Sequence, residues 1–352
     1  MSTKNLPENR KSTTPGWTST SMAPETKELS AKTEVGIGQA EVSLTANARV
    51  VPDMNVWLVG QQVSPTQRRG RYAPESFGHP AKMLPELARR IIQTYSKESA
   101  LVVDLMSGIG TTGVEAVWLG RRYVGVEIES AYFNIQQTNL ELAESQGATG
   151  EWSIHAGDAQ DDFGISGADL ITFSPPYQDA IHNQGDELAR IGRKIASGSA
   201  SDELIRRYSN WNHATEQAAA GTRSNGYSAN TTNIGHQKGN TFRASMRNIY
   251  ARAFDALKPG GYLAVVTKDQ RDRKSGELTD IYGDTVAACK DTGFLLHQHV
   301  VAILCKIDEA NGKVTHRTSH WQRMAVNKSV GTDRVVLLGQ FEDVAVFRKP
   351  LN

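Results

Sequence analysis

Short apolar segments alternate with a helical pattern through the middle of the chain. Residues 100–105, 123–128, 152–156 and 168–173 are apolar runs of strand length, and the first two flank residues 112–120, where apolar positions follow helical spacing. Strands that alternate with helices pair in parallel, because each helix returns the chain to the same edge of the sheet. The pattern therefore predicts an α/β domain with a mostly parallel sheet.

Further elements are expected on either side of this region. Residues 55–60 form a short strand candidate, and the pattern of 79–96 predicts a helix with His79 at the N-cap and Pro80 at the first helical position. Toward the C-terminus the same reasoning predicts helices within 245–261 and 280–293 and strands at 262–267, 299–305 and 342–349.

Composition divides the chain into an arm and one domain with an insertion. Residues 1–47 are rich in Ser, Thr, Lys and Glu and predict a flexible N-terminal arm, whereas 48–352 predict a folded domain. Within that domain, 178–240 is a polar insertion too long for an ordinary connection, and we expect it to be a lid or a recognition segment. In or just after it lie donors, cations and rings suited to reading bases: Trp211, Arg223, Tyr227, His236, Lys238 and Arg243.

Composition and charge exclude several classes. The 352 residues contain no apolar run of bilayer length and no N-terminal secretory signal, so we expect a soluble cytoplasmic protein. Cys289 and Cys305 are too few for a disulfide framework and lack zinc-ligand spacing, so both are expected in the core and no metal site is expected.

A net charge of +1 does not identify a partner, because a polyanion responds to a local patch. Arg68, Arg69 and Arg71 form such a patch, which predicts either a phosphate contact or a solvated loop. A salt-dependent affinity for nucleic acid would distinguish the two.

The first chemical motif runs from Asp104 to Gly113, where a strand turns into a helix. Gly108, Gly110 and Gly113 have the spacing of a dinucleotide-binding loop, and Glu127 lies at the distance of a ribose-binding acid, so an NAD-dependent oxidoreductase is an alternative. An NAD site needs its first glycine at the end of the strand, but here Asp104 stands there. A carboxylate there favours a cationic ligand such as S-adenosyl-L-methionine, whose ammonium group Asp104 would bind while Glu127 holds the ribose. Glu129 is expected to be an exposed neighbour.

The second motif, Ser174-Pro175-Pro176-Tyr177, follows the apolar run 168–173. Two prolines end a strand and stiffen the backbone, which would aim the Ser174 hydroxyl and the Pro175 carbonyl at one point and offer Tyr177 as a stacking face. A ring-bound amino group is a poor nucleophile until acceptors for its hydrogens localise its lone pair, and this motif supplies two. A polyproline turn or peptide ligand is the alternative.

Together the two motifs resemble those of the amino-methylating DNA methyltransferases of the N4-cytosine and N6-adenine group. Their signature pairs a D-x-x-x-G-x-G loop with an (S/D/N)-P-P-(Y/F/W) tetrapeptide, and the serine at 174 is closest to the N4-cytosine branch. The likeness covers roughly residues 75 to 348. It implies a Rossmann-like methyltransferase fold, with a mostly parallel seven-stranded sheet and an antiparallel last strand.

The resemblance also implies a set of site residues. Ser174, Pro175, Pro176 and Tyr177 correspond to the catalytic tetrapeptide. The residues expected to bind S-adenosyl-L-methionine are His79, Pro80, Lys82, Met83, Asp104, Met106, Ser107, Gly108, Gly110, Thr111, Thr112, Glu127, Ile128, Asp158 and Ala159. Candidate substrate contacts are Arg68, Arg69, Arg71, Arg243, Lys268 and Asp269. Several have plainer alternatives, because Asp158 can cap a turn, and Lys268 and Asp269 can be ordinary residues at a strand end.

The implied activity is methyl transfer to an exocyclic amino nitrogen of a base flipped out of double-stranded DNA, with cytosine N4 as the first expectation. A site-specific enzyme of this kind belongs to restriction–modification, so a cognate restriction endonuclease is an expected partner. The alternatives are adenine N6 in DNA, an RNA base, a protein amide, or a nucleic-acid-binding scaffold without catalysis.

Overall fold

The computed structural model describes most of one compact unit, Pro52–Asn352. The described residues are 54–79, 82–178, 232–271, 277–308, 310–315 and 339–351, with single residues and short stretches between 194 and 230 and between 326 and 337. The predicted arm 1–47, Pro80, Trp211, Arg223 and most of the insertion 178–240 lie outside the described residues.

Strands and helices follow the order that the apolar pattern predicts. The strands are β1 (Val56–Leu58), β2 (Leu101–Asp104), β3 (Arg122–Glu127), β4 (Trp152–Ala156), β5 (Ala168–Phe173), β6 (Leu257–Thr267), β7 (Gln270–Arg271), β8 (Leu278–Thr279), β9 (Leu295–Ile303), β10 (Lys306–Ile307), β11 (Val314–Thr315) and β12 (Phe341–Arg348). The helices are α1 (Ser64–Arg68), α2 (Pro85–Tyr95), α3 (Thr111–Trp118), α4 (Ser130–Ser145), α7 (Gly239–Ala256) and α8 (Ile281–Asp291), with short 3₁₀ turns η1 (Pro74–Gly78) and η2 (Ile234–His236).

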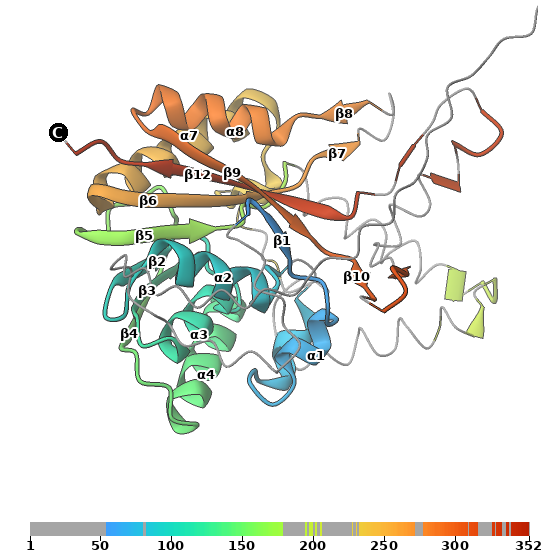
Figure 1. The fold of residues 1–352 in the computed structure, drawn as a ribbon, viewed down its shortest axis with the longest axis horizontal. Helices are drawn as coiled ribbons and strands as arrows, with labels where there is room; N and C mark the ends of the chain where they lie inside the picture. Colours follow the sequence, from blue (N-terminus) through green and yellow to red (C-terminus); the bar gives the residue numbers. More distant parts are fainter. Residues whose placement is uncertain are drawn as a thin grey trace, which may run out of the picture. The chain divides into compact units, whose positions relative to one another are not determined.

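One large sheet organises the unit, with strand order β1-β9-β12-β6-β5-β2-β3-β4 (Figure 1). Every neighbouring pair is parallel except the two that involve β12, which runs antiparallel to β6 and β9. The predicted α/β class, the mostly parallel Rossmann-like sheet and its antiparallel last strand are therefore confirmed. The sheet has eight strands where seven were expected, because β1 adds an outer strand beside β9.

Helices cover both faces of this sheet. Figure 1 shows α2, α3 and α4 on one side and α7 and α8 on the other. Successive residues of the central strands alternate between the two cores: Val102 and Leu170 pack toward α2 and α3, whereas Val103 and Ile171 pack toward α7. Burial on both faces explains why these strands are continuous apolar runs.

Chain order reverses direction at the middle of the sheet. From β2 the chain moves outward through β3 to β4, and β5 then returns to pair with the other side of β2. The loops that follow β2 and β5 consequently leave in opposite directions. In open α/β sheets, ligands bind at this reversal, beside the carboxyl ends of the strands.

The helix expected over 79–96 begins later than the sequence predicts. His79 is the residue that ends η1 and does not cap a helix, and α2 begins at Pro85 with Leu84 as its extended N-cap. The sequence offers two prolines for the first turn, Pro80 and Pro85. A proline disfavours helical backbone angles in the residue before it, so Leu84 is extended and the helix begins at Pro85. From there Leu87, Ile91 and Ile92 are buried as one apolar stripe.

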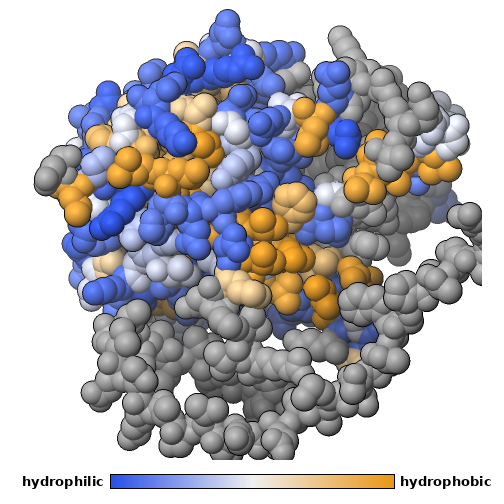
Figure 2. All heavy atoms as spheres, turned by 45° about the horizontal axis from the view of Figure 1, so that its top comes forward, coloured by the Kyte–Doolittle hydropathy of each residue, from blue (hydrophilic) through white to orange (hydrophobic). Residues whose placement is uncertain are grey.

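The surface is largely hydrophilic on the face shown in Figure 2, where apolar residues gather in a few places. Among the large apolar side chains that stay exposed are Leu58 of β1 and Phe341 of β12. Both are register partners of Ile303 in β9, so an apolar row crosses three strands at this edge of the sheet.

Cys289 and Cys305 are free and buried, as predicted. No helix in the described part of the chain combines the length and the apolar character needed to span a membrane.

The basic segment predicted as a possible phosphate contact is partly internal. Arg68 is fully buried, and its guanidinium donates hydrogen bonds to Ser64 Oγ, to the Met83 carbonyl and to Thr111 Oγ1 at the start of α3. Arg69 alone of the three arginines is exposed without an ion pair among the described residues. For Arg68, the expectation of a phosphate contact or a solvated loop was therefore wrong, because its buried guanidinium is bonded to Met83 and Thr111.

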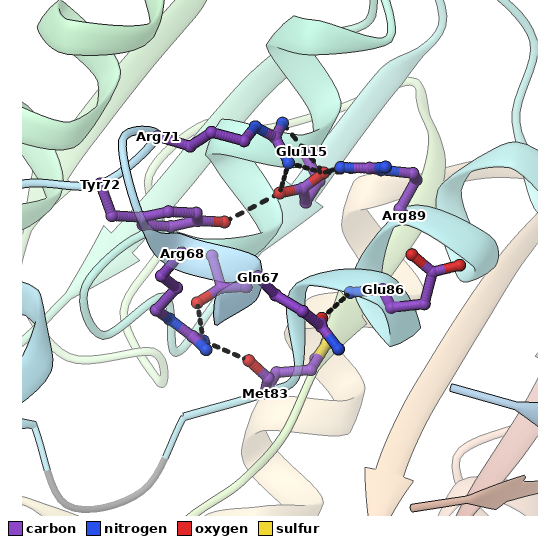
Figure 3. A network of polar contacts seen from close by, with 9 residues as sticks. Gln67, Arg68, Arg71, Tyr72, Met83, Glu86, Arg89 and Glu115 are labelled. Atoms are coloured by element: carbon purple, nitrogen blue, oxygen red, sulfur yellow. Dashed lines mark hydrogen bonds and ion pairs between the residues drawn. The ribbon is translucent and has the colours of Figure 1, made fainter. Parts of the chain in front are cut away.

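Arg71 belongs to a charged network around Glu115 of α3 (Figure 3). The fully buried Glu115 carboxylate accepts hydrogen bonds from the guanidinium groups of Arg71 and Arg89, at 2.9 and 2.8 Å, and from the Tyr72 hydroxyl at 3.0 Å. Bidentate arginine–carboxylate pairs are directional as well as strong. The network thus fixes the segment 71–72 and helix α2 onto α3, the helix that carries the glycine loop at its start.

We expect the Glu115→Ala substitution to lower the free energy of unfolding by about 3 kcal/mol, because it leaves two arginines without their shared counter-ion. Urea denaturation monitored by circular dichroism measures the change. Glu144→Ala, which removes an exposed carboxylate of α4, is the control and is expected to stay within about 0.5 kcal/mol of the wild type. Equal effects of the two substitutions would show that the network adds little stability.

Candidate functional site

Chemically active side chains converge at the carboxyl ends of four adjacent strands. Asp104 ends β2, Glu127 ends β3, Asp158 lies two residues after β4, and Ser174 follows β5 directly. Since β5, β2, β3 and β4 are consecutive parallel neighbours, these residues lie along one edge of the sheet. Their grouping follows from the parallel pairing of these strands.

The glycines of the loop between β2 and α3 serve different purposes. Gly108 and Gly110 have φ angles of 53° and 79°, which side-chain-bearing residues rarely adopt. A Cβ atom on Gly113 would lie 2.4 Å from the Tyr123 ring, so this glycine allows α3 to approach β3 closely. The first two glycines therefore shape the loop, and the third permits the packing of helix against strand.

Asp104 is buried at the base of this loop. Its carboxylate accepts hydrogen bonds from Thr112 Oγ1 at 2.6 Å and from the Met106 backbone N–H at 3.0 Å. Burial raises the pKa of the Asp104 carboxyl to about 7, although these two hydrogen bonds act in the opposite direction. The carboxylate is only 3% exposed, so little water is available to stabilise its charge.

Glu127 is held in the same way at the end of β3. One carboxylate oxygen accepts the Gly108 N–H at 2.6 Å, and the other accepts the Glu129 N–H at 2.9 Å. Burial raises the pKa of the Glu127 carboxyl to about 7, against the effect of those hydrogen bonds. The glycine loop and the end of β3 are thus joined through this side chain.

Two buried carboxylates beside one loop suit a ligand that carries positive charge and hydroxyl donors. Neither Asp104 nor Glu127 forms an ion pair with any cation of the described residues. S-adenosyl-L-methionine has an ammonium group and a ribose with two hydroxyls, and so it matches this set of acceptors. Over the described residues there is no cluster of three or more His, Cys, Asp and Glu side chains that could hold a metal ion.

Glu129 was expected to be exposed, and this expectation was wrong. Its side chain is 2% exposed and accepts a hydrogen bond from Asn233 Nδ2 at 2.6 Å. The partner lies 104 positions later in the chain. Local sequence contains no signal for such a partner, so the burial of Glu129 could not have been predicted.

The segment around His79 lies over the glycine loop. The His79 ring is 4.2 Å from that of Tyr132 between centroids, and a Cβ atom on Gly108 would be 3.5 Å from His79 Nε2. The Lys82 ammonium donates to the His79 carbonyl. Burial is the main cause, and the positive charge of Arg68 the second, that lowers the pKa of Lys82 to about 7. His79 thus lies beside the glycine loop, and Lys82 is bonded to the backbone of His79.

The remaining residues expected to bind the donor are occupied in part by protein contacts. Ser107 Oγ donates to the Val126 carbonyl at 3.0 Å, and Thr111 Oγ1 accepts from Arg68. Asp158 accepts the Gln160 N–H at 3.0 Å, which is the turn-capping role considered as its alternative. Met83, Met106 and Ile128 are half-buried, and Ala159 is buried.

The Ser-Pro-Pro-Tyr segment begins where β5 ends. Ser174 is exposed, whereas Pro175, Pro176 and Tyr177 are half-buried, and the strand before them is buried. Burial, and then the negative charges of Glu342 and Asp269, raise the pKa of the Tyr177 hydroxyl above its ordinary value. Ser174 is therefore accessible at the end of β5, and the raised pKa keeps the Tyr177 hydroxyl neutral near pH 7.

The candidate substrate contacts after β6 and in α7 have structural explanations. Asp269 Oδ1 accepts the backbone N–H groups of Ile281 and Tyr282 at the start of α8, at 2.9 and 3.2 Å. Lys268 is half-buried, and burial lowers its pKa. Arg243 is exposed on α7, and its Nε atom lies 3.9 Å from Asp284 Oδ2. Of the three, Arg243 is the one that a phosphate could reach without rearrangement.

Comparison with known proteins supports the methylase resemblance. The family model of the N6/N4 DNA methylases matches residues 8–138, which include the glycine loop and Glu127 but not Ser174. Over 63 residues the chain is 41% identical to the type II methyltransferase M2.DpnII of Streptococcus pneumoniae, covering 18% of this chain and 24% of that protein. It is 34% identical over 76 residues to the DNA adenine methyltransferase YhdJ of Escherichia coli, covering 21% and 26% respectively.

The chain thus spans about a quarter of the length of these curated relatives. An S-adenosylmethionine-dependent O-methyltransferase of Thermotoga maritima, known from a crystal structure, is 12% identical with a TM-score of 0.41, covering 79% of this chain and 69% of that one. The family match begins at residue 8, whereas the sequence motifs placed the start of the resemblance near residue 75. The similarity to the N6/N4 DNA methylases is thus found over residues 8–138.

Proposed function

We propose that this protein is an S-adenosyl-L-methionine-dependent methyltransferase that modifies an exocyclic amino nitrogen of a base in DNA. The observation that carries the proposal is the position of the two motifs at the carboxyl ends of neighbouring strands. Asp104 and Glu127 end β2 and β3, and Ser174 begins the Ser-Pro-Pro-Tyr segment after β5, the other neighbour of β2. A donor site and a site for a flat amino-bearing ring thus share the switch point of the sheet.

On the donor side, the chain supplies binding and orientation. Asp104 would accept hydrogen bonds from the ammonium group, Glu127 would accept them from the ribose hydroxyls, and Asp158 would contact the adenine. His79 and Lys82 would close over the methionine end. The donor itself supplies an activated methyl group, so the protein needs to position the acceptor nitrogen and stabilise the charge that develops there.

On the target side, the exposed Ser174 hydroxyl and the Pro175 carbonyl are proposed to accept the two amino hydrogens of the base. When both hydrogens are accepted, the lone pair of the amino nitrogen is concentrated outside the ring, and the nitrogen becomes a nucleophile. Tyr177 would stack on the base, which has to leave the duplex because its amino group is otherwise buried in base pairing. Double-stranded DNA with one base flipped out is therefore the proposed substrate.

Cytosine N4 is the proposed target atom, because serine occupies the first position of the tetrapeptide. Adenine N6 is the second candidate, since one relative is named an adenine methyltransferase. We expect DNA incubated with the protein and S-adenosyl-L-methionine to yield N4-methyldeoxycytidine after digestion to nucleosides and mass spectrometry. N6-methyldeoxyadenosine would move the target to adenine, and methylation of RNA but not DNA would refute the proposed substrate class.

The proposed enzyme acts at one DNA sequence, as in restriction–modification, where a cognate endonuclease cuts the same sequence when it is unmethylated. The polar insertion 178–240 is the proposed recognition segment, and Arg69 and Arg243 are its proposed partners for phosphates. Mapping of methylated positions in genomic DNA tests this part, with a single short motif as the expected result. Methylation spread over unrelated sequences would contradict it.

Ser174→Ala is expected to lower the rate of methyl transfer by about 100-fold or more, because one of two acceptors for the amino hydrogens is lost. Binding of S-adenosyl-L-homocysteine should stay within about twofold of the wild type, since Ser174 serves the target and not the donor. Single-turnover transfer of a labelled methyl group and calorimetric titration provide the two readouts. Ser153→Ala, at an exposed position of β4, is the matched control. Unchanged turnover of Ser174→Ala would remove this residue from the mechanism.

The affinity for S-adenosyl-L-homocysteine is expected to rise between pH 6 and pH 8. The pKa values of Asp104 and Glu127 are raised to about 7, so both carboxyls are largely protonated at pH 6, and an ammonium group binds the ionised form. In the unliganded protein, the pH dependence of folding stability has the opposite sign. A raised pKa means that the stability contributed by these groups is greatest below about pH 4 and falls as the pH approaches 7.

Calorimetric titration across this pH range measures the first effect. Asp104→Asn should weaken binding at pH 8 and flatten the pH dependence, whereas Asp255→Asn, at an exposed position of α7, should leave both unchanged. An affinity independent of pH in the wild type would contradict the assignment of these carboxylates.

A further inference from the structure

The end of β6 lies next to the Ser-Pro-Pro-Tyr segment. β5 and β6 are parallel neighbours whose last register pair is Phe173 with Val265, so both strands end at the same edge of the sheet. Ser174 follows β5 directly, and Lys268 follows Thr267, the last residue of β6. The residues after β6 thus flank the target side of the proposed site.

Tyr177 is connected to these residues. Its hydroxyl is hydrogen-bonded to the Gln270 side chain, and the negative charges of Glu342 and Asp269 act on its pKa. Asp269 has a structural task, because its carboxylate accepts the backbone N–H groups at the start of α8. The ring that is proposed to stack on the base is therefore held beside the segment that contains Lys268.

Lys268 is a cation without a partner at this edge of the sheet. It is half-buried, and its ammonium group forms neither a hydrogen bond nor an ion pair with another described residue. Burial lowers its pKa overall, although the negative charges of Glu342 and Asp343 act in the opposite direction. Asp343 is engaged by His299, whose Nε2 atom lies 2.7 Å from Asp343 Oδ1. An acceptor supplied by a ligand would offset part of the cost of burying this ammonium group.

A second polar group at the end of β6 also lacks a partner. Thr267 is 3% exposed, and its Oγ1 atom has no hydrogen-bond partner within the part of the chain that the structure describes. Buried polar groups are normally hydrogen-bonded, so each exception calls for an explanation. Two adjacent residues with unused donors indicate that a polar ligand completes this strand end.

The proposed target base carries the kind of acceptor that Lys268 lacks. Beyond its amino group, the edge of cytosine presents the ring nitrogen N3 and then the carbonyl oxygen O2. Adenine has a ring nitrogen in the same place but no carbonyl oxygen. A half-buried ammonium group suits a base that has left the duplex better than it suits a phosphate, because the base moves into the protein while the phosphate stays on the strand.

We propose that Lys268 is a specificity-determining residue whose ammonium group donates a hydrogen bond to O2 of the target cytosine, while Ser174 and Pro175 accept from N4. This inference rests on the proposed function. A site that hydrogen-bonds one group of its substrate rejects an analogue without that group, because the polar group of the site is then left unpaired. Lys268 thus favours cytosine over adenine as the target.

The test measures kcat/KM for methyl transfer to a duplex that contains the methylated sequence. The target position holds either deoxycytidine or the 2-aminopyridine C-nucleoside, which keeps the amino group and the adjacent ring nitrogen but lacks O2. We expect the wild type to be about 30-fold slower on the analogue, and Lys268→Met to be about 30-fold slower than the wild type on cytosine, because each change removes one hydrogen bond to a charged group. In Lys268→Met, the analogue should cost less than about threefold, since the contact is already lost.

The comparison of the two proteins separates this contact from other effects. Differences in base pairing and basicity between the two bases act on every variant alike and so cancel. Lys290→Met, at an exposed position of α8, is the matched control and should respond to the analogue as the wild type does. Unchanged binding of S-adenosyl-L-homocysteine by Lys268→Met, measured by calorimetric titration, shows that this variant is folded.

Three results would overturn the inference and leave the proposed methyltransferase intact. The first is equal turnover of cytosine and the analogue by the wild type, which needs no variant. The second is an equal loss on the analogue in the wild type and in Lys268→Met, as expected if Lys268 binds a phosphate. The third is methylation of adenine alone. A wild type that transfers no methyl group to any DNA would refute the proposed function, and this inference with it.

Discussion

The structure depends on the burial of two carboxylates, Asp104 and Glu127, at the ends of neighbouring strands. Burying a carboxylate without a counter-ion is costly, and here the cost is visible as pKa values raised to about 7 for both groups. Backbone and hydroxyl donors from the glycine loop and from α3 offset a part of that cost. A cationic ligand with hydroxyl groups would offset more of it. The favourable binding of such a ligand therefore follows from the arrangement of the protein alone.

Much of the surrounding structure fixes the loop that holds these carboxylates. Gly113 lets α3 lie against Tyr123 of β3, and Glu115 on the same helix binds Arg71 and Arg89. Arg68 adds a buried contact to Thr111, at the first position of α3. Two of the three arginines in the predicted basic patch, Arg68 and Arg71, thus anchor the helix of the glycine loop.

The sequence predicts the central part of this fold and its site because both depend on local pattern. Continuous apolar runs identify β2, β3 and β5, and residues that directly follow parallel strands must meet at one edge, so the grouping of Asp104, Glu127 and Ser174 could be predicted. Two buried polar residues, Gln136 and Asn139, interrupt the apolar stripe of α4, so the sequence interpretation missed that helix. The start of α2 was placed too early, because Pro80 and Pro85 both suit the first turn of a helix.

Burial of polar residues could not be predicted, since it depends on partners distant in the chain. Glu129 is buried because Asn233 binds it, and Arg68 is buried because Met83 and Thr111 accept its hydrogen bonds. Neither partner leaves a local signal. The same property makes these contacts informative, because they join segments that pattern analysis treats as independent.

A crystal structure of the protein with S-adenosyl-L-homocysteine would show directly whether these two carboxylates bind the donor. We expect the ammonium group within hydrogen-bonding distance of the Asp104 carboxylate and the ribose hydroxyls on Glu127, with the sulfur facing Ser174. A ligand bound elsewhere, or one whose ammonium and ribose contact neither carboxylate, would contradict it.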